Sequence, residues 1–213
     1  VANSEACTAC AHGQYADTHG SGGCTHCPKG TELASLGASE KAACSQCAPG
    51  FYSSNAGSHK CEPCDSGSFQ GDHGSSSCIT CEAGSANAHQ GSTSVNACKH
   101  CIAGQYAAAG AAVCSLCPGG TASAVIGATS VNTCTTVTAG FYAAEGATEG
   151  KPCAAGQYQQ SPGSSQCSDC TAGKYNPVTG GATLLACLTC PKGHWCVAGA
   201  KAPSKCAAGS ELD

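Results

Sequence analysis

Large apolar side chains are few and widely spaced along the whole chain. Leu, Ile, Val and Phe together account for 21 of the 213 residues, and a fraction below about 20% already indicates too little apolar mass for an ordinary core. Gly and Ser recur throughout, so the sequence predicts short strands and little helix. No run of 18 apolar residues occurs, and we therefore expect no membrane insertion in this segment.

Cysteine supplies what the apolar residues lack. The chain has 22 cysteines, 29 glycines and a formal net charge of −4. Cysteine at this density is typical of a disulfide scaffold from an oxidising compartment, or of a metal-binding protein from a reducing one. The small negative charge gives no reason to expect nucleic acid as a partner. A conventional single-core enzyme is therefore disfavoured.

The cysteines follow a repeated spacing that divides the chain into segments. Cys-x-x-Cys pairs begin at Cys7, Cys24, Cys44, Cys61, Cys78, Cys98, Cys114, Cys167 and Cys187. Short segments between pairs span 13 or 14 positions and cover 10–24, 47–61, 64–78, 101–114 and 153–167. Long segments span 17 positions and cover 27–44, 81–98, 117–134 and 170–187. The first cysteine of a segment is termed opening here and the last closing.

Glycine and an aromatic residue hold fixed places within the segments. Three residues after the opening cysteine lie Gly13, Gly30, Gly50, Gly67, Gly84, Gly104, Gly120, Gly156 and Gly173. A second glycine follows about ten positions after that cysteine, as in Gly20, Gly37, Gly57, Gly74, Gly91, Gly127, Gly163 and Gly180. These offsets predict backbone turns with positive φ. We expect the aromatic two residues after the first glycine to pack on the neighbouring disulfide, at Tyr15, Tyr52, Phe69, Tyr106, Tyr142, Tyr158 and Tyr175.

The order of segment sizes indicates an internal duplication. From Cys10 the segments run short, long, short, short, long, and the same order begins again at Cys101. Corresponding positions in the two copies are about 90 residues apart. We therefore expect two five-loop blocks, at 10–100 and 101–189. Residues 1–9 would close a loop from a preceding unit, and residues 190–213 would form a linker loop and a second seam.

Two missing cysteines indicate how the others pair. Val137 and Gly150 stand where segment 137–150 would have its opening and closing cysteines. If each loop is closed by its own disulfide, both partners vanish together and no thiol is orphaned. Zinc sites at the Cys-x-x-Cys pairs are the alternative, but the same loss would leave incomplete sites on both sides. The loop rule predicts nine bridges: Cys10–Cys24, Cys27–Cys44, Cys47–Cys61, Cys64–Cys78, Cys81–Cys98, Cys101–Cys114, Cys117–Cys134, Cys153–Cys167 and Cys170–Cys187.

Four cysteines remain outside this rule. Cys190 pairs with Cys196 in a tight local bridge, or with Cys206 at 16 positions. Cys206 otherwise opens a loop, and Cys7 closes a loop that has no opening cysteine. Placed end to end, Cys206 of one copy and Cys7 of the next are 14 positions apart, the short-segment spacing. This spacing predicts that the 213 residues are one repeat of a longer chain, or a subunit that bridges head to tail. The alternative is that they are a fragment with arbitrary boundaries inside a longer ectodomain.

The unit Cys-x-x-Cys-Pro-x-Gly-x-Tyr resembles ephrin-receptor-like cysteine-rich repeats. Cys27-Pro-Lys-Gly, Cys117-Pro-Gly-Gly and Cys190-Pro-Lys-Gly carry this likeness, with the Gly-Phe-Tyr and Gly-Gln-Tyr positions. The unit is also similar to the first module of tumour-necrosis-factor-receptor cysteine-rich domains, and the Ala, Gly, Ser and Thr loops resemble protist surface proteins such as ciliate immobilisation antigens. The resemblance implies a small disulfide-rich repeat, an elongated rod of tandem stapled loops, in an extracellular setting.

The residues show no sign of catalysis. Eight histidines are scattered through variable positions, and no paired acids at a fixed offset or nucleophile motif occurs. We therefore expect no enzyme activity, no cofactor and no metal site.

Two functional classes remain. The first is a non-enzymatic structural protein of the cell surface, a repeat unit of a self-associating coat or fibre secreted through an oxidising compartment. The second is a recognition ectodomain that binds a protein or glycan partner. The abundant Ser and Thr also leave covalent O-glycans open.

Overall fold

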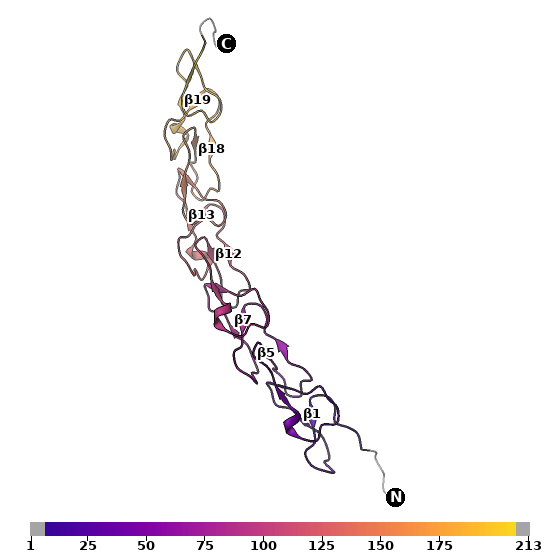
Figure 1. Cartoon of the computed structure of the whole chain (residues 1–213). Helices are drawn as coiled ribbons and strands as arrows, with labels where there is room; N and C mark the ends of the chain where they lie inside the picture. Colours follow the sequence, from indigo (N-terminus) through magenta and orange to yellow (C-terminus); the bar gives the residue numbers. More distant parts are fainter. Residues whose placement is uncertain (1–6, 208–213) are drawn as a thin grey trace. The chain divides into compact units, whose positions relative to one another are not determined.

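The computed structural model describes residues 7–207. The chain divides into two compact units, Val1–Lys99 with Ala108–Val113, and His100–Ala107 with Cys114–Asp213. Within each unit, loops follow one another in sequence order (Figure 1). None of the helices in the described range is long and apolar enough to cross a membrane.

Two-residue strands are the main regular elements. In the first unit β1 (Gln14–Tyr15) pairs with β2 (Thr25–His26), β3 (Thr31–Glu32) with β4 (Ser45–Gln46), β5 (Phe51–Tyr52) with β6 (Glu62–Pro63), and β7 (Ser68–Phe69) with β8 (Ile79–Thr80). β9 (Ser85–Ala86) follows, and β10 (Lys99–His100) lies at the boundary of the units. All four of these pairs are antiparallel hairpins.

The second unit repeats the arrangement. Here β11 (Gln105–Tyr106) pairs with β12 (Ser115–Leu116), β13 (Thr121–Ala122) with β14 (Thr135–Thr136), β15 (Phe141–Tyr142) with β16 (Lys151–Pro152), β17 (Gln157–Tyr158) with β18 (Ser168–Asp169), β19 (Lys174–Tyr175) with β20 (Leu188–Thr189), and β21 (His194–Trp195) with β22 (Ser204–Lys205). The predicted fold class, a disulfide-rich repeat of stapled loops with short strands and little helix, is confirmed.

The Cys-x-x-Cys motif builds each hairpin directly. The first strand follows the first glycine of a segment, and the two residues between the paired cysteines form the return strand. The backbone N–H of Cys27 then donates to the carbonyl of Gly13 over 2.8 Å and closes the first hairpin. The spacing of cysteines and glycines therefore fixes strand register as well as loop length.

A short 3-10 turn distinguishes the long segments from the short ones. The turns are η1 (Lys41–Ala43), η2 (Val95–Ala97), η3 (Val131–Thr133) and η4 (Leu184–Ala186). Each ends at the closing cysteine of its segment, as where the Cys98 N–H donates to the Val95 carbonyl. The three additional residues are thus absorbed locally, and the hairpin that follows is unchanged.

Each loop is hydrogen-bonded to the next along the chain. The N–H of Gly30 donates to the carbonyl of Ser53 in the following loop over 2.9 Å. In return, the N–H of Gly57 in that loop donates to the carbonyl of Cys27 over 2.8 Å. Equivalent pairs recur within both units, so neighbouring loops satisfy several of each other's backbone polar groups.

In most loops, the first glycine also meets the loop after next. A Cβ added at Gly13 would lie 1.9 Å from the carbonyl oxygen of Gly57, and one added at Gly120 would lie 1.9 Å from that of Gly163. Both first glycines have positive φ, at 73° and 85°. The predicted positive φ is confirmed at every first and second glycine named from the sequence.

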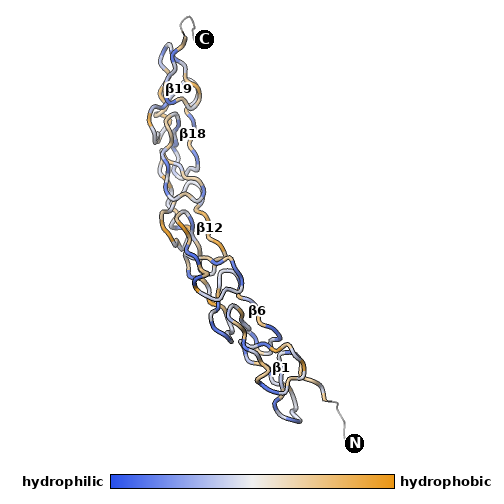
Figure 2. The backbone as a smooth tube through the Cα atoms, viewed as in Figure 1, coloured by the Kyte–Doolittle hydropathy of each residue, from blue (hydrophilic) through white to orange (hydrophobic). Residues whose placement is uncertain are grey.

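The buried centre of each unit consists mainly of cysteine. Opening cysteines from Cys27 to Cys170 are at most 1% exposed, whereas most closing cysteines are partly exposed. Among the aromatics expected to cover the disulfides, Tyr15 is buried and packs with Cys27 and Leu33, and the other six are only half-buried. Figure 2 accordingly shows apolar and polar residues alternating along the tube with no long apolar stretch.

Two glycines in the second unit test the contact between a loop and the loop after next. We expect Gly120→Ala to lower stability by more than about 4 kcal/mol, because its Cβ would meet backbone that cannot move away. Gly173→Ala is the matched control: it has the same place in its loop and a φ of 82°, but none of the described residues lies within 4 Å of its Cβ position. That variant should lose only about 1–3 kcal/mol to the left-handed backbone. Equal shifts in thermal unfolding would contradict the packing argument.

Candidate functional site

Disulfides are the dominant side-chain chemistry of the chain. The loop-closing bridges in the structure are Cys10–Cys24, Cys27–Cys44, Cys47–Cys61, Cys64–Cys78, Cys81–Cys98, Cys101–Cys114, Cys117–Cys134, Cys153–Cys167 and Cys170–Cys187. Their Cα–Cα distances run from 5.6 to 5.8 Å, so every closed loop presents the same covalent geometry to its neighbours.

The last loop is closed differently. Cys190 pairs with Cys196 over a sequence separation of 6, and Pro203 stands where the spacing would place a closing cysteine. The alternative bridge from Cys190 to Cys206 is not formed. Trp195, next to Cys196, is 45% exposed. This loop therefore keeps its hairpin, β21 with β22, without a bridge of standard length.

Two cysteines carry free thiols. Cys7 is exposed and Cys206 is partly exposed. The backbone N–H of Cys206 donates to the Gly193 carbonyl over 3.0 Å, as an opening cysteine does in the loops before it. Cys206 thus begins a loop in its backbone geometry, although the residues that would continue that loop, 208–213 and 1–6, lie outside the described residues.

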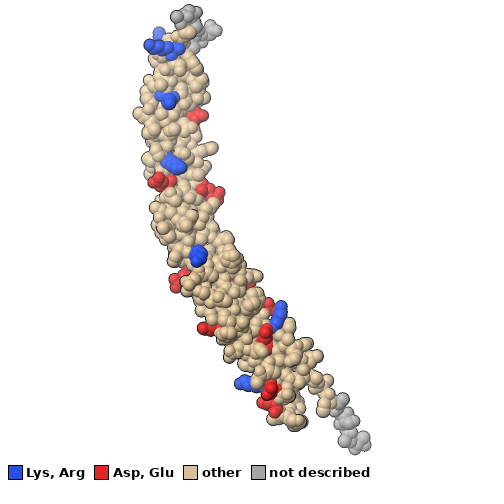
Figure 3. Space-filling model, viewed as in Figure 1, with Lys and Arg blue, Asp and Glu red and all other residues tan. Residues whose placement is uncertain are grey.

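Acidic, histidine and cysteine side chains do not gather into a site. Among residues 7–207, no group of three or more such side chains could hold a metal ion. One ion pair is present in that range, with Lys60 Nζ 3.1 Å from Glu62 Oε1. Figure 3 shows charged residues scattered over the visible face, most of which carries neither sign. On that face the charged residues form no large patch of one sign.

The missing bridge of segment 137–150 is replaced by an apolar contact. Val137 is buried and packs with Ala122 and Ala143. A Cβ added at Gly150 would lie 2.8 Å from Val137 Cγ1, so the valine already occupies part of the space of the lost disulfide. The Val137 backbone keeps the role of an opening cysteine: its N–H donates to Gly120 and its carbonyl accepts from Gly163.

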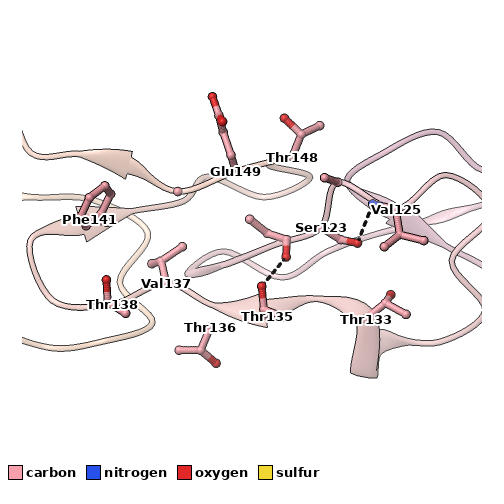
Figure 4. Close-up of a pocket in the computed structure, with 13 residues that line it drawn as sticks. Ser123, Val125, Thr133, Thr135, Thr136, Val137, Thr138, Phe141, Thr148 and Glu149 are labelled. Atoms are coloured by element: carbon pink, nitrogen blue, oxygen red, sulfur yellow. Dashed lines mark hydrogen bonds between the residues drawn. The ribbon is translucent and has the colours of Figure 1, made fainter.

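A cavity of about 450 Å³ lies beside this replacement in the second unit. Its lining is rich in hydroxyl groups, with one carboxylate, one aromatic ring and small apolar side chains; the residues are Ala122, Ser123, Ala124, Val125, Thr133, Thr135, Thr136, Val137, Thr138, Phe141, Thr148, Glu149 and Gly150. In Figure 4, the strand that carries Thr135 faces the segment with Thr148 and Glu149, and Val137 lies between them.

Some of the hydroxyls are used within the fold and others are not. Thr135 Oγ1 donates to the Ala122 carbonyl over 3.1 Å, and Ser123 Oγ accepts from the Val125 N–H over 3.3 Å; both bonds are dashed in Figure 4. The side chains of Thr136, Thr138, Thr148 and Glu149 make no hydrogen bond or ion pair to the described residues. The cavity therefore offers three hydroxyls and a carboxylate to a ligand.

Two buried asparagines were missed by the sequence reasoning. Asn87 Nδ2 donates to the Ser68 carbonyl over 2.9 Å, and Asn176 Nδ2 donates to the Gln157 carbonyl over 2.7 Å. Both side chains are at most 1% exposed. Each lies six residues after the opening cysteine of the last loop in its block, so their shared offset was the available signal. These bonds support the internal duplication at the level of side chains.

Substitution of Val137 tests whether the apolar contact replaces the bridge energetically. Val137→Ala should lower the free energy of unfolding by about 1–2 kcal/mol, because two buried methyl groups are lost. Val125→Ala removes the same atoms from the same cavity wall, but that side chain is 51% exposed, and its effect should stay within about 0.5 kcal/mol. Chemical denaturation of the oxidised proteins would measure both, and a harmless Val137 variant would contradict this role.

The comparisons with known proteins agree with the repeat. Residues 1–44 and 50–98 match the family model described as "Tyrosine-protein kinase ephrin type A/B receptor-like". No curated protein matches the chain. The matched family is a receptor-like cysteine-rich repeat and not an enzyme family, and together with the disulfides it indicates an extracellular or secreted protein. Over these two tandem segments, therefore, the chain is similar to the ephrin-receptor-like cysteine-rich repeats.

Proposed function

We propose that this chain is a non-enzymatic extracellular structural protein, the repeat unit of a coat or fibre in which copies join head to tail. One observation carries the proposal: within each unit, most loops use the next loop for hydrogen bonds and the loop after next for close glycine packing. Such an arrangement does not limit the number of loops, because each added loop presents the same contacts to the one that follows.

The contacts that repeat inside the units are open near both ends of the described chain. Gly193 is the first glycine of the loop that begins at Cys190, and no atom of residues 7–207 lies within 4 Å of its Cβ position. Gly20 is the second glycine of the loop that begins at Cys10, and its Cβ position is equally open to the described residues. Inside a unit, a first glycine meets the carbonyl of the second glycine two loops later. Gly193 of one copy and Gly20 of another could therefore make the same contact with each other.

The repeat spacing gives the register of the proposed junction. Cys206 of one copy would open a composite loop, and Cys7 of the next copy would close it with a bridge at the short-segment spacing of 14. The loop from Cys10 of that next copy is then two loops after the one from Cys190. Gly193 would pack on the carbonyl of Gly20 from the next copy, as Gly120 packs on Gly163.

The surface is compatible with self-association. Charges are sparse on the face seen in Figure 3, and most residues of the return strands are exposed. Self-association through backbone contacts needs no charged patch. The exposed Ser and Thr residues are available for covalent O-glycans, which would add bulk to a coat. A recognition ectodomain is the second candidate, and the hydroxyl-rich cavity favours it.

Covalent joining can be tested on the native material by denaturing electrophoresis. A ladder in steps near 20.6 kDa that collapses on reduction is the expected result. Large material that resists reduction would mean one continuous tandem polypeptide and would overturn joining by Cys206 and Cys7. A species of unit size in both lanes would overturn covalent assembly.

The glycine register makes a second, non-covalent prediction. In a Cys7→Ser/Cys206→Ser background, Gly193→Ala should weaken end-to-end association at least 10-fold in sedimentation velocity, because its Cβ would meet the incoming backbone. Gly110→Ala is the control, since it has a φ of 75° and only ordinary contacts for a Cβ, nearest Thr80 Cγ2 at 3.6 Å. Equal association of the two variants would rule out the proposed register.

A further inference from the structure

We propose that the cavity beside Val137 and Gly150 is a binding site for a neutral pyranose unit of a glycan. The site is separate from the head-to-tail junction, and the proposal does not depend on self-association. It follows from the loss of one disulfide, from the hydroxyl groups left without partners and from the absence of a cation in the lining (Figure 4).

The lost bridge explains why the cavity is located here. In a bridged loop, both half-cystines fill the space between the opening and closing positions. In segment 137–150 the closing position is Gly150, which contributes no side chain, and Val137 fills only part of the gap. The corresponding loop of the first block is closed by Cys47–Cys61. The duplication thus supplies one copy with the bridge and one copy without it.

The polar lining matches the chemistry of sugar hydroxyls. Thr136, Thr138 and Thr148 each carry a hydroxyl that can donate and accept, and none is used inside the fold. The Glu149 carboxylate can accept from two adjacent ligand hydroxyls. No lysine, arginine or histidine lines the cavity, so a ligand carboxylate or sulfate would face Glu149 without compensation. The lining therefore selects neutral sugars over anionic ones.

The apolar lining and the size fit the same ligand. Phe141 is 37% exposed at the edge of the cavity, and its ring offers a flat apolar surface to the C–H face of a pyranose. The volume of about 450 Å³ lies within the range of about 300–1,000 Å³ usual for small-molecule sites. Because the cavity is open to solvent and lined by several exposed side chains, it suits a sugar at the end of a glycan.

A variant that restores the bridge is the sharpest test. Val137→Cys/Gly150→Cys places two cysteines 13 positions apart, the separation of Cys101–Cys114. Mass spectrometry would verify that the new bridge forms. This variant should melt at a higher temperature and bind neutral methyl glycosides at least 10-fold more weakly, because the bridge fills the floor of the cavity. Stability and binding would then change in opposite directions, which misfolding cannot produce.

Surface variants provide a second measurement that does not depend on the new bridge. Glu149→Gln and Phe141→Ala should each weaken binding of the preferred glycoside about 5-fold or more in ligand-observed NMR titrations. Phe51→Ala is the matched control, since Phe51 has the same place in the bridged loop of the first block and is 39% exposed. It should leave affinity unchanged.

The titration panel would contain methyl glucoside, galactoside, mannoside and N-acetylglucosaminide, with a uronic acid and a sialic acid as anionic sugars. Binding of at least one neutral sugar and of neither anionic one is expected. The proposal would be overturned if no neutral glycoside bound at concentrations up to 50-fold above the millimolar range usual for single sugars. It would also be overturned if the oxidised double-cysteine variant bound glycosides as tightly as the unaltered protein. Neither result would alter the electrophoretic test of self-association.

Discussion

Close backbone approach at glycine is the constraint on which the rest of this structure depends. At Gly13, Gly30 and Gly120, a carbonyl oxygen from two loops later occupies the place that a Cβ would need. This approach brings the loops near enough for N–H groups and carbonyls to pair between neighbours, and it encloses the opening half-cystines without large apolar side chains. A chain that is about one-tenth Leu, Ile, Val and Phe can therefore bury its disulfides, because glycine backbone does the packing that side chains do elsewhere.

The features that the sequence could predict are those set by spacing. Glycines at fixed offsets predicted positive φ. The paired absence at Val137 and Gly150 led to a rule that gives nine of the ten bridges found among the described residues. Contacts that depend on which loops meet in space were out of reach. The aromatics illustrate this: Tyr15 is buried against Leu33, whereas Tyr106 and its equivalents are half-buried. The cavity beside Gly150 and the buried Asn87 and Asn176 also required the neighbouring loop to be known.

The two functional ideas place different demands on the same repeat. Assembly uses backbone geometry that most loops share, so its specificity must come from the ends. There, among the described residues, Cys7 and Cys206 have no bridge, and Gly20 and Gly193 have no neighbour within 4 Å of their Cβ positions. Ligand recognition uses a place where the repeat is broken, since there a loop without a bridge combines unpaired hydroxyls with open space. A protein built this way can vary one property without disturbing the other, because each loop contacts only its near neighbours.

The unbridged stretch also gives the chain one elastic element. Each closed loop holds its ends about 6 Å apart, as the Cα–Cα distance of 5.7 Å at Cys47–Cys61 shows, although 14 residues pulled straight would span up to about 50 Å. Tension applied to the oxidised chain could therefore lengthen a bridged loop very little, even after its hydrogen bonds break. Between Cys134 and Cys153 no bridge limits the extension. Under tension, this stretch would extend first and over the greatest length. The loss of two cysteines therefore lets it take up extension that the disulfide-closed loops on either side cannot.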